Sequence, residues 1–235
     1  MEVIKKNMLE NNLEEGSSMM NKWEVFLTAP YAMLKKTILK WVKSGSRILD
    51  LGAYEGRLED YLEEKGGRYT VECVDVDAEA LRILKSKKYE NVEASAIQAD
   101  ANQYLEDHQG SNNTDAIFLS AVLHEINDPS NKSDYLKHFF EKAKSILGPR
   151  GIIVISDLYY ADSVSDEEVE RFRAYQLKAV NHADARNKFV KPELIKKMAE
   201  ENGFSVESFE EIRAVKEIDR RYFVIILKAT QNTEC

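Results

Sequence analysis

The stretch Arg-Ile-Leu-Asp-Leu-Gly-Ala-Tyr-Glu-Gly-Arg at residues 47 to 57 decides the fold of this 235-residue chain. An apolar run that ends in Asp50 passes into a turn with two glycines, and a helical pattern follows. Gly52 and Gly56 have no Cβ, so the backbone there adopts conformations that other residues avoid and approaches a ligand closely. Because the first N–H groups of a helix point at whatever lies before it, the segment predicts a nucleotide-binding turn.

A second strand-like run, Val-Glu-Cys-Val-Asp-Val-Asp, lies at residues 71 to 77. Its Asp75 stands 23 residues after Gly52, close to the spacing of about 20 residues at which a carboxylate meets ribose hydroxyls. A turn that binds a dinucleotide needs a second glycine beside the pyrophosphate, and Tyr54 occupies that position. The two runs therefore favour an adenosine cofactor without a pyrophosphate.

These segments resemble the class I S-adenosylmethionine-dependent methyltransferases. The family's first motif reads roughly Asp-Leu-Gly-x-Gly-x-Gly, and residues 50 to 56 match it with Tyr54 in place of the middle glycine. Four more matches follow in the family's order, and the resemblance covers roughly residues 47 to 228. They lie at residues 75 to 77, 98 to 101, 115 to 126 and 147 to 157.

The resemblance implies S-adenosylmethionine as the cofactor, S-adenosylhomocysteine as its product, and no metal. It implies that Asp75 binds the ribose, that Val76 lies against the adenine, and that Asp100 accepts a hydrogen bond from the adenine amino group. The backbone N–H after Asp100 would meet the ring. The cofactor-binding residues expected in this way are Asp50, Gly52, Gly56, Asp75, Val76, Asp100, Ala101 and Ser120.

The fold class predicted is α/β. Apolar runs alternate with helical patterns, which is typical of parallel strands joined by crossover helices. Two further runs, at 204 to 212 and 222 to 227, are separated by nine residues, too few for a parallel crossover of about 12 or more, so they should pair antiparallel. The family fold implies the same arrangement, a Rossmann-like, doubly wound, mostly parallel sheet of seven strands with an antiparallel C-terminal hairpin. The runs expected as the other strands lie at 47–51, 71–76, 94–98, 116–120 and 152–156, and the helices at 55–65, 77–86, 133–147 and 192–202.

The length favours a single domain. We expect residues 1 to 45 to form an N-terminal helical cap or arm, with helix up to about residue 13 and a second, amphipathic helix beginning near Pro30. Residues 46 to 235 would form the methyltransferase domain, with an inserted helical lid at about 159 to 190 that begins with a capping box from Ser165 to Glu168.

Composition excludes several classes of protein. The formal charge of −8 disfavours nucleic acid as the main partner, because phosphates need clustered Lys and Arg. No run is long and apolar enough for a signal peptide or a membrane helix, which predicts a cytoplasmic protein without a membrane partner. Cys73 and Cys235 offer neither a disulfide framework nor the spacing of a metal site. The oligomeric state stays open.

Methyl transfer requires mainly that the two reactants are oriented, so a general base is optional. His124, four residues beyond Ser120, is the first candidate base, and Glu125 should point elsewhere on a helical turn. His182 in the lid is the second candidate. The residues expected to bind the substrate are Tyr31, Asp157, Tyr159 and Tyr160. Each histidine could instead cap a helix or pack, and Tyr159 and Tyr160 could be core residues.

The sequence thus predicts an enzyme that methylates an oxygen or nitrogen atom of a small-molecule or peptide-derived acceptor, in specialised metabolism. An N-methyltransferase of a peptide or protein amine is the alternative, favoured where Asp157 and Glu125 serve a cationic acceptor. A cofactor-binding regulatory protein without turnover is a third possibility.

Overall fold

A computed structural model describes residues 19–215 and 218–230, so the helical arm predicted before residue 13 lies outside the described residues. In the described part, seven strands form one sheet in the order β3-β2-β1-β4-β5-β7-β6. This confirms the predicted fold class, including the weakly marked third strand. The strands are β1 (Arg47–Leu51), β2 (Tyr69–Asp75), β3 (Val92–Gln98), β4 (Thr114–Ser120), β5 (Leu147–Tyr160), β6 (Phe204–Arg213) and β7 (Arg220–Ala229).

The strand order reverses between β1 and β4, which places a crevice at their carboxyl ends. β1 pairs in parallel with β2 on one side and with β4 on the other. The chain therefore winds outward in both directions from β1, and the loops after β1 and β4 leave the sheet on opposite faces. Ligands of open α/β sheets bind in such crevices, so the topology sets the position of the site.

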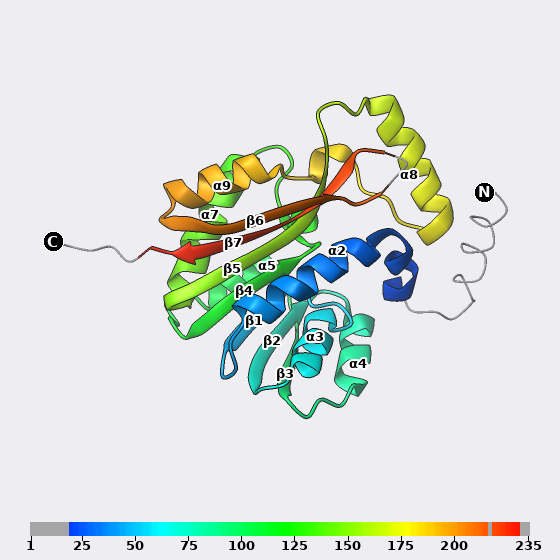
Figure 1. Ribbon diagram of the computed structural model, residues 1–235. Helices are drawn as coiled ribbons and strands as arrows, with labels where there is room; N and C mark the ends of the chain where they lie inside the picture. Colours follow the sequence, from blue (N-terminus) through cyan, green and yellow to red (C-terminus); the bar gives the residue numbers. More distant parts are fainter. Residues whose placement is uncertain (1–18, 216–217, 231–235) are drawn as a thin grey trace.

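Helices cover both faces of the sheet (Figure 1). One layer contains α2 (Met19–Trp41), α3 (Arg57–Lys65) and α4 (Ala78–Ser86), and the other contains α5 (Ala101–Asp107), α7 (Lys132–Ile146) and α9 (Pro192–Glu201). The short α6 (Leu123–Ile126) follows β4. Outside the two layers, α8 (Asp166–Val180) and the 3-10 turn η1 (Arg186–Lys188) lie beyond the carboxyl ends of the parallel strands. The central strands are apolar on both faces because both layers bury them.

The prediction that a helix begins near Pro30 is wrong, because α2 begins at Met19 and contains Pro30. Proline removes one backbone hydrogen bond from a helix and bends it, and Figure 1 shows α2 bent in its first part. The amphipathic pattern after Pro30 is confirmed. Met33, Leu34, Ile38 and Val42 are buried, while Lys36 and Lys40 are exposed.

β5 is longer than predicted. It pairs in parallel with β4 and antiparallel with β7, and the second pairing extends to Tyr160 opposite Arg220. Asp157, Tyr159 and Tyr160 therefore lie within the strand and not just beyond it. Sequence periodicity missed this because Ser156 and Asp157 interrupt the apolar run, and pairing with β7 holds the residues after them extended. The antiparallel hairpin of β6 and β7 is confirmed.

The capping box that predicts the start of α8 is confirmed. The Ser165 hydroxyl accepts from the backbone of Glu168, whose carboxylate accepts from the backbone N–H of Ser165. Among the side chains of α8 that the structure describes, the buried ones are Val169, Phe172 and Gln176, which share one side of a helix at spacings of three and four.

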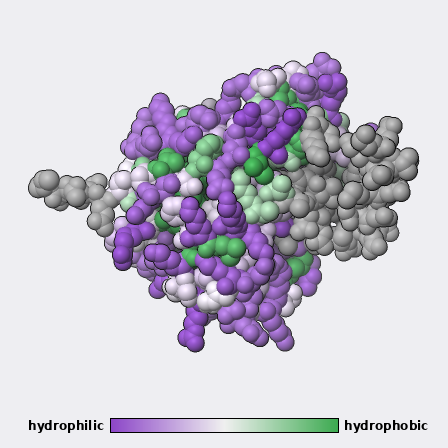
Figure 2. All heavy atoms as spheres, in the orientation of Figure 1, coloured by the Kyte–Doolittle hydropathy of each residue, from purple (hydrophilic) through white to green (hydrophobic). Residues whose placement is uncertain are grey.

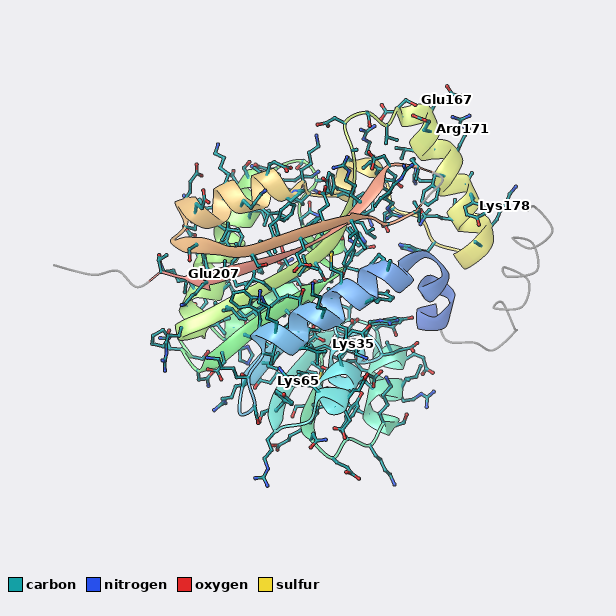
Figure 3. All side chains as sticks on the ribbon, in the orientation of Figure 1. Lys35, Lys65, Glu167, Arg171, Lys178 and Glu207 are labelled. Atoms are coloured by element: carbon teal, nitrogen blue, oxygen red, sulfur yellow. The ribbon has the colours of Figure 1, made fainter. Side chains whose placement is uncertain are left out.

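Most other side chains of α8 that the structure describes face solvent, although Ala179 packs against the core. Tyr175 and Leu177 are 39% and 49% exposed, because their positions turn them away from the sheet. Figure 3 shows Glu167, Arg171 and Lys178 extending outward from α8.

A contiguous apolar core fills the space between the sheet and its two helical layers. The surface seen in Figure 2 is largely hydrophilic with small apolar areas. Among the residues that the structure describes, no helix is both long and apolar enough to cross a membrane.

Candidate functional site

The glycine turn after β1 is built as a cradle. Gly52 has φ +76°, and a Cβ there would lie 2.4 Å from Val122 Cγ2, so no other residue fits without displacing the loop after β4. Gly56 has φ +86° and is the N-cap of α3, with no side chain capping the helix. The backbone N–H groups at the start of α3 thus have no side-chain partner at this cap and point into the turn.

Tyr54, the departure from the glycine pattern, adopts the left-handed conformation that glycine usually supplies, with φ +49°. Its backbone N–H donates to Asp75 Oδ2 at 2.8 Å. This hydrogen bond offsets part of the cost of the conformation, so the turn keeps its shape although a tyrosine stands in it.

Asp75, at the end of β2, is oriented by the backbone on both of its oxygens. Oδ2 accepts from Tyr54 and Oδ1 accepts from the N–H of Asp77 at 2.9 Å. A carboxylate has about four lone-pair positions, so two stay available for a ligand. Asp77 itself caps α4 by accepting from the backbone N–H groups of Glu79 and Ala80.

The other predicted cofactor residues line the same edge of the sheet. Val76 is 64% exposed, a large apolar side chain with nothing packed over it. Asp100 caps α5, and both of its backbone hydrogen bonds use Oδ1. Ala101 is buried behind it, and Ser120 is half-buried where β4 ends. The structure thus brings these residues to the carboxyl edge of β1 to β4, where the sequence placed them.

Two acids lie buried beneath the glycine turn. Asp50 is 3% exposed and Glu59, on α3, is fully buried. Burial raises the pKa of Glu59 to about 7, and the Cys73 thiol donates to its Oε1 at 3.1 Å. Burial, together with the nearby Glu59 and Asp75 carboxylates, raises the pKa of Asp50 well above its usual range. Burial and the repulsion between neighbouring carboxylates both favour the protonated, neutral form of such acids.

On the other side of the crevice, His124 and Asp157 form a buried pair. Asp157 Oδ1 accepts from His124 Nδ1 at 2.7 Å, and Oδ2 accepts from the backbone N–H of His124 at 2.9 Å. The N–H of Leu158 also donates to Asp157. The Asp157 carboxylate therefore fixes the imidazole ring and leaves Nε2 pointing away from the strand.

The loop after α8 closes over that nitrogen. His124 Nε2 lies 3.5 Å from Asp184 Oδ2 and 3.5 Å from Glu125 Oε1. His182 Nε2 lies 2.8 Å from Asp184 Oδ2 and 3.6 Å from Glu125 Oε1. Both predicted histidines thus meet in one cluster. The expectation that Glu125 points away from His124 is wrong, because α6 is one short turn that allows both side chains to face the lid loop.

Charge within this cluster is balanced. Burial would lower the pKa of His124, but Asp157 and then Asp184 raise it to about 10. Hydrogen bonds that His182 donates to the carboxylates of Asp184 and Glu125 raise the pKa of His182 to about 9. Burial alone would raise the pKa of Asp184, yet His124, His182 and Lys188 together lower it well below its usual range. The cluster therefore holds cations and carboxylates against one another.

A second polar group, Arg220, is buried nearby at the start of β7, with 4% of its surface exposed. Its guanidinium carbon lies 4.8 Å from the ring centre of Phe189, 5.3 Å from that of Tyr160 and 5.9 Å from that of Phe172. Among the described residues, neither Arg220 Nε nor the Tyr160 hydroxyl has a hydrogen-bond partner. The ring centre of Phe189 also lies 4.9 Å from that of His124, so the aromatic rings around Arg220 are next to the histidine cluster.

The remaining predicted substrate residues are less closely grouped. The Tyr159 hydroxyl donates to Glu211 on β6, and its ring packs on Phe223 of β7. Both contacts hold Tyr159 against the hairpin. Tyr31, on α2, is half-buried beneath the guanidinium of Arg57 at 3.6 Å. Tyr159 and Tyr160 both line an open hollow of about 520 Å³ beside η1 and α9.

Sequence reasoning missed Asp184, Lys188 and Arg220. The spacing His-Ala-Asp at 182 to 184 inside a polar segment was a signal for the first of them. No sequence pattern pointed to Arg220. Its neighbour Arg221, which pairs with Glu211, is partly exposed, and only burial distinguishes the two arginines.

Comparison with known proteins agrees with this geometry. A family model described as a methyltransferase domain matches residues 25–208. No curated protein matches the sequence.

Solved structures of methyltransferases share the fold. A methyltransferase from Aquifex aeolicus that depends on S-adenosylmethionine is 18% identical, with a TM-score of 0.56 over 94% of this chain and 97% of that one. A similar enzyme from Methanosarcina mazei is 16% identical, with a TM-score of 0.56 over 83% and 98%. Phosphoethanolamine N-methyltransferase 2 of Haemonchus contortus is 16% identical, with a TM-score of 0.63 over 89% and 56%. With the family match spanning most of its length, the chain belongs to the class I S-adenosylmethionine-dependent methyltransferases.

Proposed function

We propose that this methyltransferase transfers the methyl group of S-adenosylmethionine to an oxygen or nitrogen atom of a small-molecule acceptor in specialised metabolism. The observation that carries the proposal is the set of polar side chains buried under the lid: His124 and Asp157 beside the crevice, and Arg220 with Tyr160 next to them. Buried polar groups in a largely apolar enclosure are typical of sites that orient a small ligand.

The cradle after β1 fits S-adenosylmethionine. The turn backbone at Gly52, the fixed Asp75 carboxylate and the exposed Val76 supply a close backbone approach, a ribose partner and an apolar wall. When bound, the cofactor supplies an electrophilic methyl group. Asp75, Val76, Asp100 and the turn residues would hold it there, with the methyl end directed toward β4 and the acceptor.

The residues of β4, β5 and the lid would hold the acceptor. Its nucleophilic atom has to approach the methyl group in line, and orienting the two reactants is worth about 7–11 kcal/mol of the barrier. His124 is the residue that we propose to lie nearest this atom, because it follows β4 at the crevice and Asp157 fixes its ring below the lid loop, whose Asp184 faces Nε2. The roof formed by α8 and its loop would exclude water.

The acceptor would carry an oxygen-bearing group, such as a carboxylate or a carbonyl, for Arg220. A buried guanidinium without a hydrogen bond at Nε is costly, and a ligand oxygen would satisfy both it and the Tyr160 hydroxyl. The peptide or protein amine is the weaker candidate. Asp157, which would have to bind the cation, already accepts from His124 and from the backbone.

The experiment uses methyl-labelled cofactor and a metabolite extract of the native organism, with mass spectrometry of the labelled products. A labelled small molecule with a carboxylate or carbonyl group supports the proposal, and label confined to peptides or proteins contradicts it. Once the acceptor is identified, Arg220→Met should raise the KM for it by roughly 10-fold or more. A hydrogen bond to a charged group is worth about 1.5–3 kcal/mol, which corresponds to that factor. Arg171→Met, at an exposed arginine of α8, is the matched control.

Calorimetry tests the cofactor separately. S-adenosylhomocysteine should bind and NAD should not, because Tyr54 stands where a pyrophosphate needs glycine.

A further inference from the structure

Three potential metal-ligand atoms converge between α6 and the lid loop: Nε2 of His124, Oε1 of Glu125 and Oδ2 of Asp184. A second imidazole nitrogen, Nε2 of His182, lies beside the two carboxylate oxygens. The four separations measured among them are 2.8, 3.5, 3.5 and 3.6 Å. His124, Glu125 and Asp184 form the one group of this kind within the residues that the structure describes.

The far side of each of three ligands is held by another residue, so that one atom of each faces inward. His124 Nδ1 donates to Asp157, the arrangement that orients metal-bound histidines in many sites. Lys188 Nζ lies 2.7 Å from Glu125 Oε2 and 3.0 Å from Asp184 Oδ1, the two carboxylate oxygens that point away from the cluster. The lysine therefore stands behind the carboxylates and leaves Oε1 and Oδ2 with the imidazole nitrogens.

The separations suit a small ion. Bonds of about 2.0–2.2 Å in a tetrahedral arrangement place neighbouring ligand atoms about 3.3–3.6 Å apart. Three of the four observed distances lie at or near that range, and the shorter one, from His182 to Asp184, involves the most exposed ligand. Two imidazoles with two carboxylates are typical ligands of divalent transition metals, whereas Mg²⁺ and Ca²⁺ prefer oxygen alone.

We propose that His124, Glu125, His182 and Asp184 bind one divalent transition-metal ion, of the class of Zn²⁺, Mn²⁺ or Fe²⁺, and that Asp157 and Lys188 orient the ligands. Imidazole binds a metal as the neutral base, so binding releases a proton from each histidine that carries one on Nε2. The site departs from the expectation that no metal binds. It escaped sequence reasoning because its ligands come from two segments about 60 residues apart.

The ion would join the lid to the core, since two ligands come from α6 and two from the loop after α8. A further role rests on the proposed function. An oxygen of the acceptor that coordinated the ion would lose its proton more easily and become a better nucleophile, without a general base. Metal binding itself does not depend on that role.

Equilibrium dialysis of the full chain, first freed of metal by a chelator, tests the site with Zn²⁺ and Mn²⁺ alone. We expect one ion per chain, measured by mass spectrometry of the elements. Asp184→Asn and Glu125→Gln should each weaken binding by at least 10-fold. Asp157→Asn, behind the ligands, should weaken it by about 10- to 100-fold.

His138→Asn is the matched control, because His138 is an exposed histidine 3.4 Å from Glu141, outside the cluster. It should bind the ion as the unchanged chain does. Affinity for S-adenosylhomocysteine, measured on every variant, shows that each one folds. Glu125 is partly exposed, so its variant keeps the test valid if Asp184→Asn does not fold.

Absence of bound metal in the unchanged chain, or equal binding by Glu125→Gln and the control, overturns the proposal. The cluster would then be a network of protonated histidines and carboxylates that closes the lid without an ion. Because no acceptor or activity enters the assay, failure here leaves the proposed methyl transfer standing, and failure to find an acceptor leaves the metal site standing.

Discussion

The two sides of the crevice bury their carboxylates in different ways. Beneath the glycine turn, Asp50 and Glu59 are buried, and within the described residues no Lys, Arg or His forms an ion pair with either of them. Beneath the lid, Asp157 and Asp184 are equally buried, but His124, His182 and Lys188 contact them. Burial raises the pKa of the first pair, whereas cations lower the pKa of Asp184.

The difference shows what each side is built to do. Acids that keep a proton are compatible with a fixed scaffold under a cofactor, since they need no partner that moves. Acids that stay ionised depend on the cations beside them. When such a cation moves or loses its proton, the carboxylate can bind a proton, another cation or a polar ligand in its place. The lid side is therefore where chemistry and closure are coupled, and variants on the two sides should fail in different assays.

The largest effect is expected at His124. His124→Asn should lower turnover by about 10²-fold or more, because the acceptor side of the crevice loses the imidazole that Asp157 holds in place. Affinity for S-adenosylhomocysteine should stay nearly unchanged, since His124 lies on the lid side. Steady-state kinetics and calorimetry on the same protein measure both. Retained turnover with a lowered melting temperature would instead make His124 a packing residue.

Glu59 tests the cofactor side through pH. Its pKa is raised from 4.5 to about 7 by burial, so the folded chain binds the proton more tightly than the unfolded chain does. Stability from this group is complete below pH 4.5 and is lost as pH rises through about 7. By linkage, the difference in unfolding free energy between Glu59→Gln and the unchanged chain should shift by up to about 3 kcal/mol between those limits.

Denaturant unfolding at a series of pH values measures this difference. Glu64→Gln, an exposed change on the same helix, is the control and should leave the pH dependence of the unchanged chain intact. A parallel pH profile for Glu59→Gln and the unchanged chain would remove the distinction between the two sides of the crevice.

Asp75 tests the ribose contact. Asp75→Ala should weaken binding of S-adenosylhomocysteine by roughly 10- to 150-fold, because a hydrogen bond to a charged group is worth about 1.5–3 kcal/mol. The loss includes the support that Asp75 gives to the Tyr54 and Asp77 N–H groups. Titration calorimetry measures it, and unchanged affinity would mean that the ribose lies elsewhere.

The smallest effect is expected at Asp77, two residues further on. Asp77→Ala removes the cap of α4, which is worth about 1 kcal/mol of stability, and should leave cofactor affinity unchanged. Thermal unfolding beside calorimetry separates the two quantities. Lost affinity here together with retained affinity in Asp75→Ala would reverse the assignment of the two acids.

Local patterns predicted where the residues of the cofactor side lie in the fold, because strand ends and helix starts are specified by neighbouring sequence. Asp75, Asp77 and Asp100 each follow a strand and precede a helix, so their positions follow from the alternation of elements. The lid side was predicted only in part. The capping box placed the start of α8, but nothing local indicated that Gln176 is buried while Tyr175 and Leu177 are exposed.

The sequence by itself determined the alternation of strands and helices, the antiparallel hairpin and the glycine turn, since these depend on periodicity, loop length and backbone freedom at a few positions. Only the tertiary structure decided that α2 continues through Pro30, that β5 extends to Tyr160, and that His124, Glu125, His182 and Asp184 meet. Each of these depends on contacts between segments distant in the chain. Such contacts leave no period in the sequence, because burial and charge pairing across space, not neighbouring residues, select the side chains that make them.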